Sequence, residues 1–339
     1  MNLPKVSLHE HLIASMRPEL ALKIARRNGL DITHFIADDT HYKFNLDDID
    51  DFFKMYDNVC DVVKTPQDYH DIAYDFLTRS AAEGALYIEF QVCPLYYGVK
   101  DTRNIINSTI DLARYDDNFA ALCEGINRAF NETGIKCNFV VATLRSWGNE
   151  GAMKVLDFIE QRPCDLFRGF GTVENENFGT FSDYAPAFER ARKMGLGIAP
   201  HAGEQAGPES IRGALKLGAT RIGHGFRCIE DKDLMDEIKA RDILLEICPT
   251  GNQTLIPACR DLSRHPLRQI FDYGIKVCLN CDDAGMFGTT IGREYDLAKT
   301  ELGFTDKELF QMTLNGLEKS FAPADMRNQM IATAKLARE

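Results

Sequence analysis

The sequence lacks any apolar run of the ~20 residues that a membrane-spanning helix needs. It also has few positive charges: 39 Lys and Arg residues stand against 51 Asp and Glu residues, and the formal net charge is -12 at pH 7. A protein that binds nucleic acid through its phosphates needs clustered cations. Residues 1–11 contain no charged leader followed by an apolar stretch. We therefore expect a cytoplasmic protein that binds neither membranes nor nucleic acid, although a nucleoside, which carries no phosphate, is compatible with this charge.

Regularly spaced cysteines, repeats, low-complexity tracts and Pro/Ser-rich linkers are absent as well. The ten cysteines are scattered between Cys60 and Cys281, and in a long chain without a secretory signal this distribution indicates reduced thiols rather than a disulfide framework. A composition of 45% hydrophobic and 27% charged residues is typical of a globular protein. We expect a single domain over residues 1–339.

Short β-rich runs alternate with longer helical patterns, which predicts a parallel sheet with helical crossovers. Pro208 and the capping box from Thr305 to Glu308 mark the starts of two such helices. The segment 16–83 is longer than one crossover needs. We therefore expect a (β/α)₈ barrel of the TIM type, in which this helical excursion between strands one and two covers the barrel mouth. The eight expected strands are 5–11, 86–92, 136–144, 165–173, 197–201, 221–225, 243–248 and 276–282.

Polar residues gather where these strands are expected to end, which is where barrels place their active sites. His9 and His11 are two apart on strand one, so both side chains point to the same face and can reach one ion. Alone, a His-x-His pair can be a chance or surface feature. His201 and Asp282, at the ends of later strands, complete three imidazoles and a carboxylate, a set that predicts one catalytic Zn²⁺ per chain with a position open for water.

A metal with an open position makes hydroxide available at neutral pH, which suits hydrolysis. Glu204 lies three residues past His201, close enough to give a proton to a ring nitrogen while the adjacent carbon is attacked. His224 could orient or deprotonate the water, and Asp283 could hydrogen-bond a substrate nitrogen. Each of these residues, taken singly, could also be a structural polar group at a strand end.

Four motifs resemble those of the adenosine deaminase family, in the same order and with similar spacing over nearly the whole chain. They are 3–12 (LPKVSLHEHL), 201–204 (HAGE), 222–225 (IGHG) and 279–283 (LNCDD). The resemblance implies that His9, His11, His201 and Asp282 bind zinc, that Glu204 protonates purine N1, that His224 acts on the hydrolytic water and that Asp283 contacts N7. The substrate would then be a purine or purine nucleoside.

Three further motifs, 207–211 (GPESI), 248–250 (CPT) and 287–290 (FGTT), are more similar to the adenosine than to the adenine branch of the family. They favour conversion of adenosine or deoxyadenosine to inosine or deoxyinosine. Two departures weaken this choice. Ile13 stands where the family usually has an acidic residue that contacts the ribose 5′-hydroxyl, and the run from Gly171 to Glu174 places Glu174 where a glycine N–H usually meets purine N3. Gly171 and Glu174 are therefore candidate substrate contacts, and adenine or a modified 6-aminopurine is the alternative substrate.

Two other readings stay open. In a binuclear amidohydrolase, Glu174 at the end of strand four would bridge two metal ions. Alternatively, the barrel could only bind a purine or a protein without turning it over, although a complete set of ligands, acid and base argues against lost catalysis.

Overall fold

The computed structural model describes residues 3–46, 48–99 and 102–338, and the parallel strands of this part of the chain form two sheets. The strand order is β1-β2-β3-β4-β5 in one sheet and β6-β7-β8-β9 in the other. Every one of the eight expected runs contains a strand. Their bounds are β1 Lys5–His11, β2 Ala85–Val92, β3 Lys136–Leu144, β4 Phe167–Val173, β5 Gly197–Ile198, β6 His201–Ala202, β7 Arg221–His224, β8 Leu244–Ile247 and β9 Lys276–Leu279.

Backbone hydrogen bonds join the two sheets into a barrel. At one seam, His11 N–H donates to Asp282 O at 3.0 Å and Asp282 N–H donates to His9 O at 3.0 Å. At the other seam, the chain between β5 and β6 changes partner, because Ala199 N–H donates to Phe170 O at 3.0 Å whereas Pro200 O accepts from Gly223 N–H at 2.9 Å. The expected (β/α)₈ barrel is confirmed.

Two of the expected strands are wrong in detail. The fifth is interrupted at Ala199 and Pro200, where the partner changes from β4 to β7 and Pro200, which faces β7, has no N–H to donate. His201 therefore begins β6 instead of ending a strand. The eighth ends at Leu279, so Asp282 lies beyond it, in the left-handed backbone region with φ +66°.

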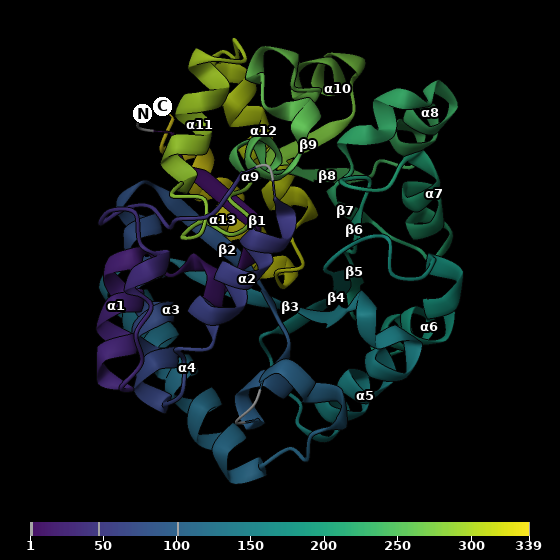
Figure 1. Ribbon diagram of the computed structural model, residues 1–339. Helices are drawn as coiled ribbons and strands as arrows, with labels where there is room; N and C mark the ends of the chain where they lie inside the picture. The colour runs from purple at the N-terminus through teal and green to yellow at the C-terminus, as the bar shows by residue number, and fades with distance from the viewer. Residues whose placement is uncertain (1–2, 47, 100–101, 339) are drawn as a thin grey trace.

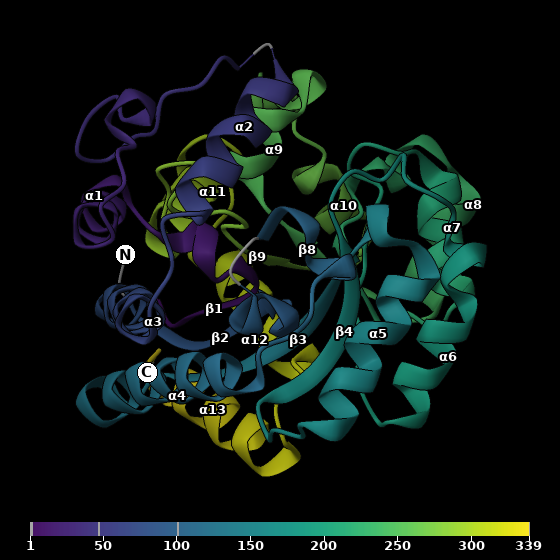
Figure 2. The same ribbon diagram turned by 60° about the horizontal axis from the view of Figure 1, so that its bottom comes forward.

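Helices lie outside the strands, as Figure 1 shows for α5, α6, α7 and α8. Helix α7 begins at Pro208, and the capping box of Thr305 and Glu308 opens α12, both as expected. Figure 2 shows α3 and α4 running side by side. The outer helices are α3 Pro66–Ala82, α4 Leu112–Thr133, α5 Gly148–Gln161, α6 Ala185–Lys193, α7 Pro208–Lys216, α8 Lys232–Ala240, α10 Leu267–Tyr273, α11 Ile291–Thr300, α12 Asp306–Lys319 and α13 Ala324–Leu336.

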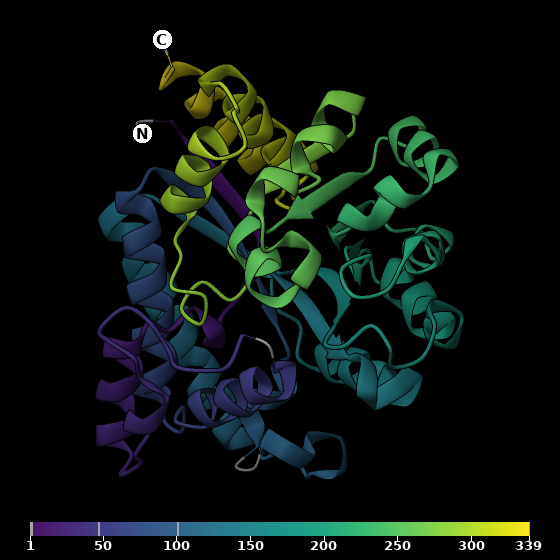
Figure 3. The same cartoon turned by 45° about the horizontal axis from the view of Figure 1, so that its top comes forward.

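The excursion between β1 and β2 lies against the loops at the ends of the strands. Phe52 stacks on Phe287, with the ring centroids 5.5 Å apart, and Arg260 Nη2 donates to Leu46 O at 2.8 Å. In Figures 2 and 3, α2 lies beside the green segment around α9. The expected cover of the barrel mouth is confirmed for the part of the excursion up to α2, whereas α3 packs on the barrel exterior against α4. Its elements are the short helix η1 Ile13–Ser15, α1 Pro18–Arg27, η2 Thr33–Phe35 and α2 Ile49–Cys60, and α9 spans Pro249–Leu255.

Phe321 closes the opposite end of the barrel. A Cβ at Gly197 would lie 2.2 Å from the Phe321 ring, and a Cβ at Gly169 would lie 2.6 Å from it. The ring therefore fits only because both strands carry glycine at these points. The Arg221 guanidinium lies 3.7 Å from the centre of the same ring.

All ten cysteines are free thiols, which confirms the expectation of no disulfide framework. Among the described helices, none is long and apolar enough to cross a membrane. The assignment of residues 1–339 to one domain stays a prediction.

Candidate active site

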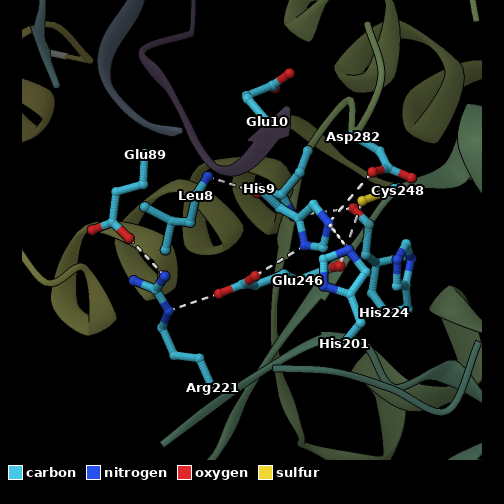
Figure 4. A network of polar contacts seen from close by, with 12 residues as sticks. Leu8, His9, Glu10, Glu89, His201, Arg221, His224, Glu246, Cys248 and Asp282 are labelled. Carbon is cyan, nitrogen blue, oxygen red and sulfur yellow. Dashed lines mark hydrogen bonds and ion pairs between the residues drawn. The ribbon is translucent and has the colours of Figure 1, made fainter. Parts of the chain in front are cut away.

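The four predicted ligands converge at the mouth end of the barrel. The ligand atoms of His9, His11, His201 and Asp282 all lie within 4.8 Å of one another. His9 Nε2 is 3.0 Å from His201 Nε2 and 3.4 Å from Asp282 Oδ1, and His11 Nε2 is 3.1 Å from the same oxygen. Figure 4 shows the side chains of His9, His201 and Asp282 directed toward one another.

These distances fit a zinc-class ion. Ligands held tetrahedrally at ~2.0–2.1 Å from zinc lie about 3.3 Å from one another, close to the spacings between His9, His11 and Asp282. The Nε2 atoms of His9 and His201 face each other directly, an arrangement in which a cation can bind both nitrogen lone pairs. The donor set of imidazoles and one carboxylate is also the one that zinc prefers.

The backbone explains how the chain delivers these ligands. His9 and His11 point to one face of β1, whereas Glu10 points to the other, where its carboxylate accepts from Ser7 Oγ at 2.6 Å and from the Cys281 N–H at 3.1 Å. Asp282 reaches the histidines through its left-handed conformation, which L residues other than Asn and Asp rarely adopt. Such strain persists only where surrounding contacts hold it, and here the two backbone bonds to β1 do so.

The charged groups around the cluster favour positive charge at its centre. Burial alone would lower the pKa of His9, but hydrogen bonds to Asp282 and Glu246 raise that pKa to about 10. Burial opposes ionisation of Asp282, yet its bonds to His11 and His9 bring its pKa well below the ordinary value. Burial and the neighbouring imidazoles lower the pKa of His201. The acidic groups around His9 thus stabilise a cation at this point, whether a proton or a metal ion.

Glu204 and His224 lie beside this cluster. Glu204 is 7% exposed, and burial followed by the charge of Asp282 raises its pKa well above the ordinary value. Burial lowers the pKa of His224 to about 3, which favours its neutral imidazole. His224 Nε2 lies 3.7 Å from Glu204 Oε2. A carboxyl and an imidazole whose pKa values are shifted in opposite directions therefore lie next to the four candidate ligands.

Asp283 is also buried in the site. Within the described residues its Oδ1 has no hydrogen-bond partner, and the same holds for Oε1 of Glu204. Burial and the adjacent Asp282 charge raise the pKa of Asp283 to about 7. Both side chains are thus available to a bound molecule.

Two residues that the sequence analysis missed position the predicted ones. Glu176 is 4% exposed and accepts from the backbone N–H groups of Gly203, Glu204 and Gln205 at 2.7–3.0 Å. Asn252, at the start of α9, lies with Nδ2 3.2 Å from His224 Nδ1. Neither belongs to a motif with a catalytic meaning, and no sequence signal marks them beyond their closeness to motifs.

A cavity of about 760 Å³ opens next to Glu204. Phe44 and Phe52 of the excursion form one wall, and Asn175 and Arg227 belong to the loops that follow β4 and β7. The mouth cover and the strand-end loops thus enclose a space large enough for a small molecule.

The candidate substrate contacts are placed as follows. Glu174 has φ +82°, the conformation that favours glycine, and its carboxylate accepts from the Ser146 N–H at 2.9 Å. At Gly171 a Cβ would lie 2.3 Å from Ala199 O, so close strand approach alone requires glycine there. Ile13 is partly buried and packs against the core. Substrate contacts by Gly171 and Glu174 stay predictions, and so does the loss of a ribose contact at Ile13.

The binuclear alternative gains no support from Glu174. Over the described residues, two groups of metal-binding atoms converge, the four predicted ligands and the set of His224, Cys248 and Asp282, and neither contains Glu174.

Comparisons with known proteins agree with this site. The adenosine deaminase family is matched over residues 4–335. The adenine deaminase of Agrobacterium fabrum is 34% identical over 332 residues, which cover 98% of each protein, and that of Rhizobium meliloti is 32% identical over the same length and coverage. The crystal structure of adenine deaminase from Arthrobacter aurescens is similar with a TM-score of 0.86 at 26% identity, covering 98% of both chains. With its motifs, its barrel and these relatives, the chain belongs to the adenosine deaminase family.

Proposed function

We propose that this protein is a metal-dependent hydrolase that replaces the 6-amino group of a purine by oxygen and releases ammonia. The observation that carries the proposal is the buried Glu204 carboxyl, which lies beside the converging atoms of three histidines and one aspartate. His9, His11, His201 and Asp282 would hold one Zn²⁺ per chain. When bound there, the ion would supply activation of water at neutral pH.

The other residues divide the proton transfers. Glu204 gives its proton to purine N1, which makes the neighbouring C6 more electrophilic. Neutral His224 takes a proton from the attacking water, and its ring is held by Asn252. Asp283, with a pKa of about 7, can donate a hydrogen bond to the N7 lone pair. The proton held by His224 then passes to the amino group, the C6–N bond breaks and ammonia leaves. The proton of the hydroxyl on C6 returns to Glu204, so that water and the 6-aminopurine yield the 6-oxopurine and ammonia.

We further propose that the free base adenine is the preferred substrate. The adenine deaminases of Agrobacterium fabrum and Rhizobium meliloti match this chain over 98% of their own length. In addition, Ile13 stands where the family usually has an acidic residue that contacts the ribose. This apolar side chain offers the sugar no hydrogen bond. The proposed contacts of Glu204 with N1 and of Asp283 with N7 involve atoms of the base and require no sugar.

A nucleoside, adenosine or deoxyadenosine, is the second candidate. It is favoured by the cavity of about 760 Å³, which offers more room than a purine base needs. A 6-aminopurine modified on its amino group would use the same room.

Ammonia release from a panel of purines tests the proposal. The zinc-loaded protein is assayed with adenine, adenosine, deoxyadenosine and 6-methylaminopurine, and each assay is repeated on protein stripped by a chelator and then reloaded. We expect the highest kcat/KM for adenine, loss of activity on stripping and recovery on reloading. If the loaded protein releases ammonia (or methylamine) from none of them, the proposed function is wrong. A preference for adenosine would overturn only the choice of the free base.

A further inference from the structure

A buried chain of charged groups lies beneath metal ligand His9. His9 Nδ1 is 3.1 Å from Glu246 Oε2, and Glu246 Oε1 is 2.7 Å from Arg221 Nε. Arg221 Nη2 then donates to Glu89 Oε2 at 2.6 Å. The contact between Arg221 Nε and Glu246 is an ion pair and not an aligned hydrogen bond. Figure 4 shows the series running from Glu89 through Arg221 and Glu246 to His9.

The chain crosses the barrel interior. His9 is on β1, Glu89 on β2, Arg221 on β7 and Glu246 on β8. The side chains of Glu89, Arg221 and Glu246 are each 0% exposed. Breaking such a buried pair strongly destabilises the folded protein, so these groups stay in contact and their positions are tightly defined. A side chain held this firmly can fix the orientation of its neighbour.

The charges of the chain do not balance internally. Two carboxylates, Glu89 and Glu246, face one guanidinium, Arg221, which leaves one negative charge in the interior. Glu89 already accepts hydrogen bonds from the Tyr87 hydroxyl at 2.8 Å and from the Phe321 N–H at 2.6 Å, in addition to its pair with Arg221. Glu246 has fewer partners than Glu89, because its Oε1 has only the ion pair with Arg221 and its Oε2 faces His9 Nδ1. A positive centre at the metal cluster would therefore lie on the side of the chain where Glu246 needs it.

The hydrogen bond to Glu246 also decides which nitrogen of His9 can bind a metal. A carboxylate has only lone pairs to offer, so Nδ1 must carry a proton, and Nε2 is the nitrogen that can offer its lone pair to a metal. Nε2 is the atom that faces His201 and Asp282. We propose that Glu246, held in place by Arg221 and Glu89, is a positioning residue that fixes the tautomer and orientation of His9 and thereby strengthens metal binding. The inference uses the proposed metal site but not the purine chemistry.

Glutamine at position 246 would put two requirements in conflict. Its amide oxygen could accept from His9 Nδ1, but its NH₂ group would then point at Arg221, which has only donors. With the amide turned round, Arg221 is satisfied and NH₂ faces Nδ1, which forces the proton onto Nε2 and blocks the ligand atom. The first orientation places two donors against each other, so it is disfavoured, and the second blocks the nitrogen that binds the metal. Zinc binding should therefore weaken, although the side chain keeps its shape.

The matched control is Glu89→Gln. It makes the same chemical change in the same buried chain and also breaks an ion pair with Arg221, but it lies one link further from His9. Both variants should lower the Tm of the metal-free protein. Only Glu246→Gln should weaken zinc binding, by about ten- to a hundred-fold, which is typical for loss of a carboxylate behind a histidine ligand.

Zinc affinity is measured by competition with a chromophoric chelator, without substrate. Wild-type affinity in Glu246→Gln overturns the proposal, and so does an equal loss in Glu246→Gln and Glu89→Gln, because the effect would then be general destabilisation. Should Glu246→Gln not fold, the tautomer of His9 in the zinc-loaded wild type decides the matter. Histidine-selective ¹⁵N NMR should show a proton on Nδ1 of His9 and metal on Nε2, and the opposite tautomer would refute the proposal. Neither readout depends on whether any purine is deaminated.

Discussion

The carboxylate of Glu176 accepts the backbone N–H of Glu204 at 2.7 Å, so one buried acidic residue anchors another. The same carboxylate also receives Ser210 Oγ at 2.6 Å. Both oxygens of Glu176 accept from the turn after His201, and one also accepts from Ser210 in α7, so Glu176 holds the backbone in place while leaving the Glu204 side chain free. The proposed proton donor is therefore positioned through its main chain, and its side chain can be changed without removing the anchor.

Glu204→Gln should keep zinc and still bind purine while turnover falls by a factor on the order of 10² or more, because an amide is a very poor proton donor. Steady-state kinetics and metal content check this. Glu189→Gln, the same change on exposed helix α6, is the control and should behave like the wild type. Near-normal turnover in Glu204→Gln would remove it from the proton-donor role.

Asp282→Ala should lose both metal and activity, because it removes the only carboxylate among the four converging ligands of the described site. Metal content after dialysis against a weak chelator gives the result. Asp283→Asn, next along the chain, should retain zinc but lose purine affinity. Stoichiometric zinc in Asp282→Ala would show that Asp282 is no ligand.

The double change Ile13→Asp with Glu174→Gly should raise kcat/KM for adenosine relative to other 6-aminopurines. A charge-assisted hydrogen bond to the ribose is worth roughly 1.5–3 kcal/mol, or about ten- to a hundred-fold in selectivity. Glycine also relieves the left-handed strain at position 174. Each single variant is assayed to separate the two effects. A native enzyme that already prefers adenosine strongly, and loses efficiency on the double change, would contradict this explanation.

Glu294 should make stability depend on pH. Burial raises its pKa from the ordinary 4.5 to about 7, against hydrogen bonds from Thr250 and Thr289 that lower it. Since the folded pKa exceeds the unfolded one, this contribution to stability is complete below about pH 4.5 and is lost as pH rises through 7. The loss is at most about 3 kcal/mol.

Glu294→Gln should abolish this dependence, because it cannot ionise. The Tm of the wild type relative to the variant is followed by calorimetry, and it should fall between about pH 4.5 and 7 and level off above. A constant Tm difference over this range would mean that Glu294 is not buried as a neutral acid.

Local patterns were sufficient to predict the parts of the molecule that depend on local sequence. The alternation of β-rich and helical runs predicted the barrel, and the two-residue spacing of His9 and His11 predicted that both face one ion. The interruption at Pro200 was missed, because β-rich character continues on both sides of it. The conformation of Asp282 could not be predicted either, since pairing with β1, and not its own neighbours, holds it.

Side-chain contacts between residues far apart in the sequence could not be predicted either. Glu89, Arg221 and Glu246 each look like an isolated charge in an apolar strand, and only barrel closure brings them into contact. Glu176 resembles a solvated loop residue until the turn at Gly203 wraps around it. The cytoplasmic location remains a prediction.

The Phe321 ring fills the space left by Gly169 and Gly197, so small residues at these two positions are a condition for packing that end of the barrel. The cavity beside Glu204 lies elsewhere, against Phe44 and Phe52. A substitution of either glycine should therefore act on folding, through the displaced ring, and leave the walls of the cavity unchanged.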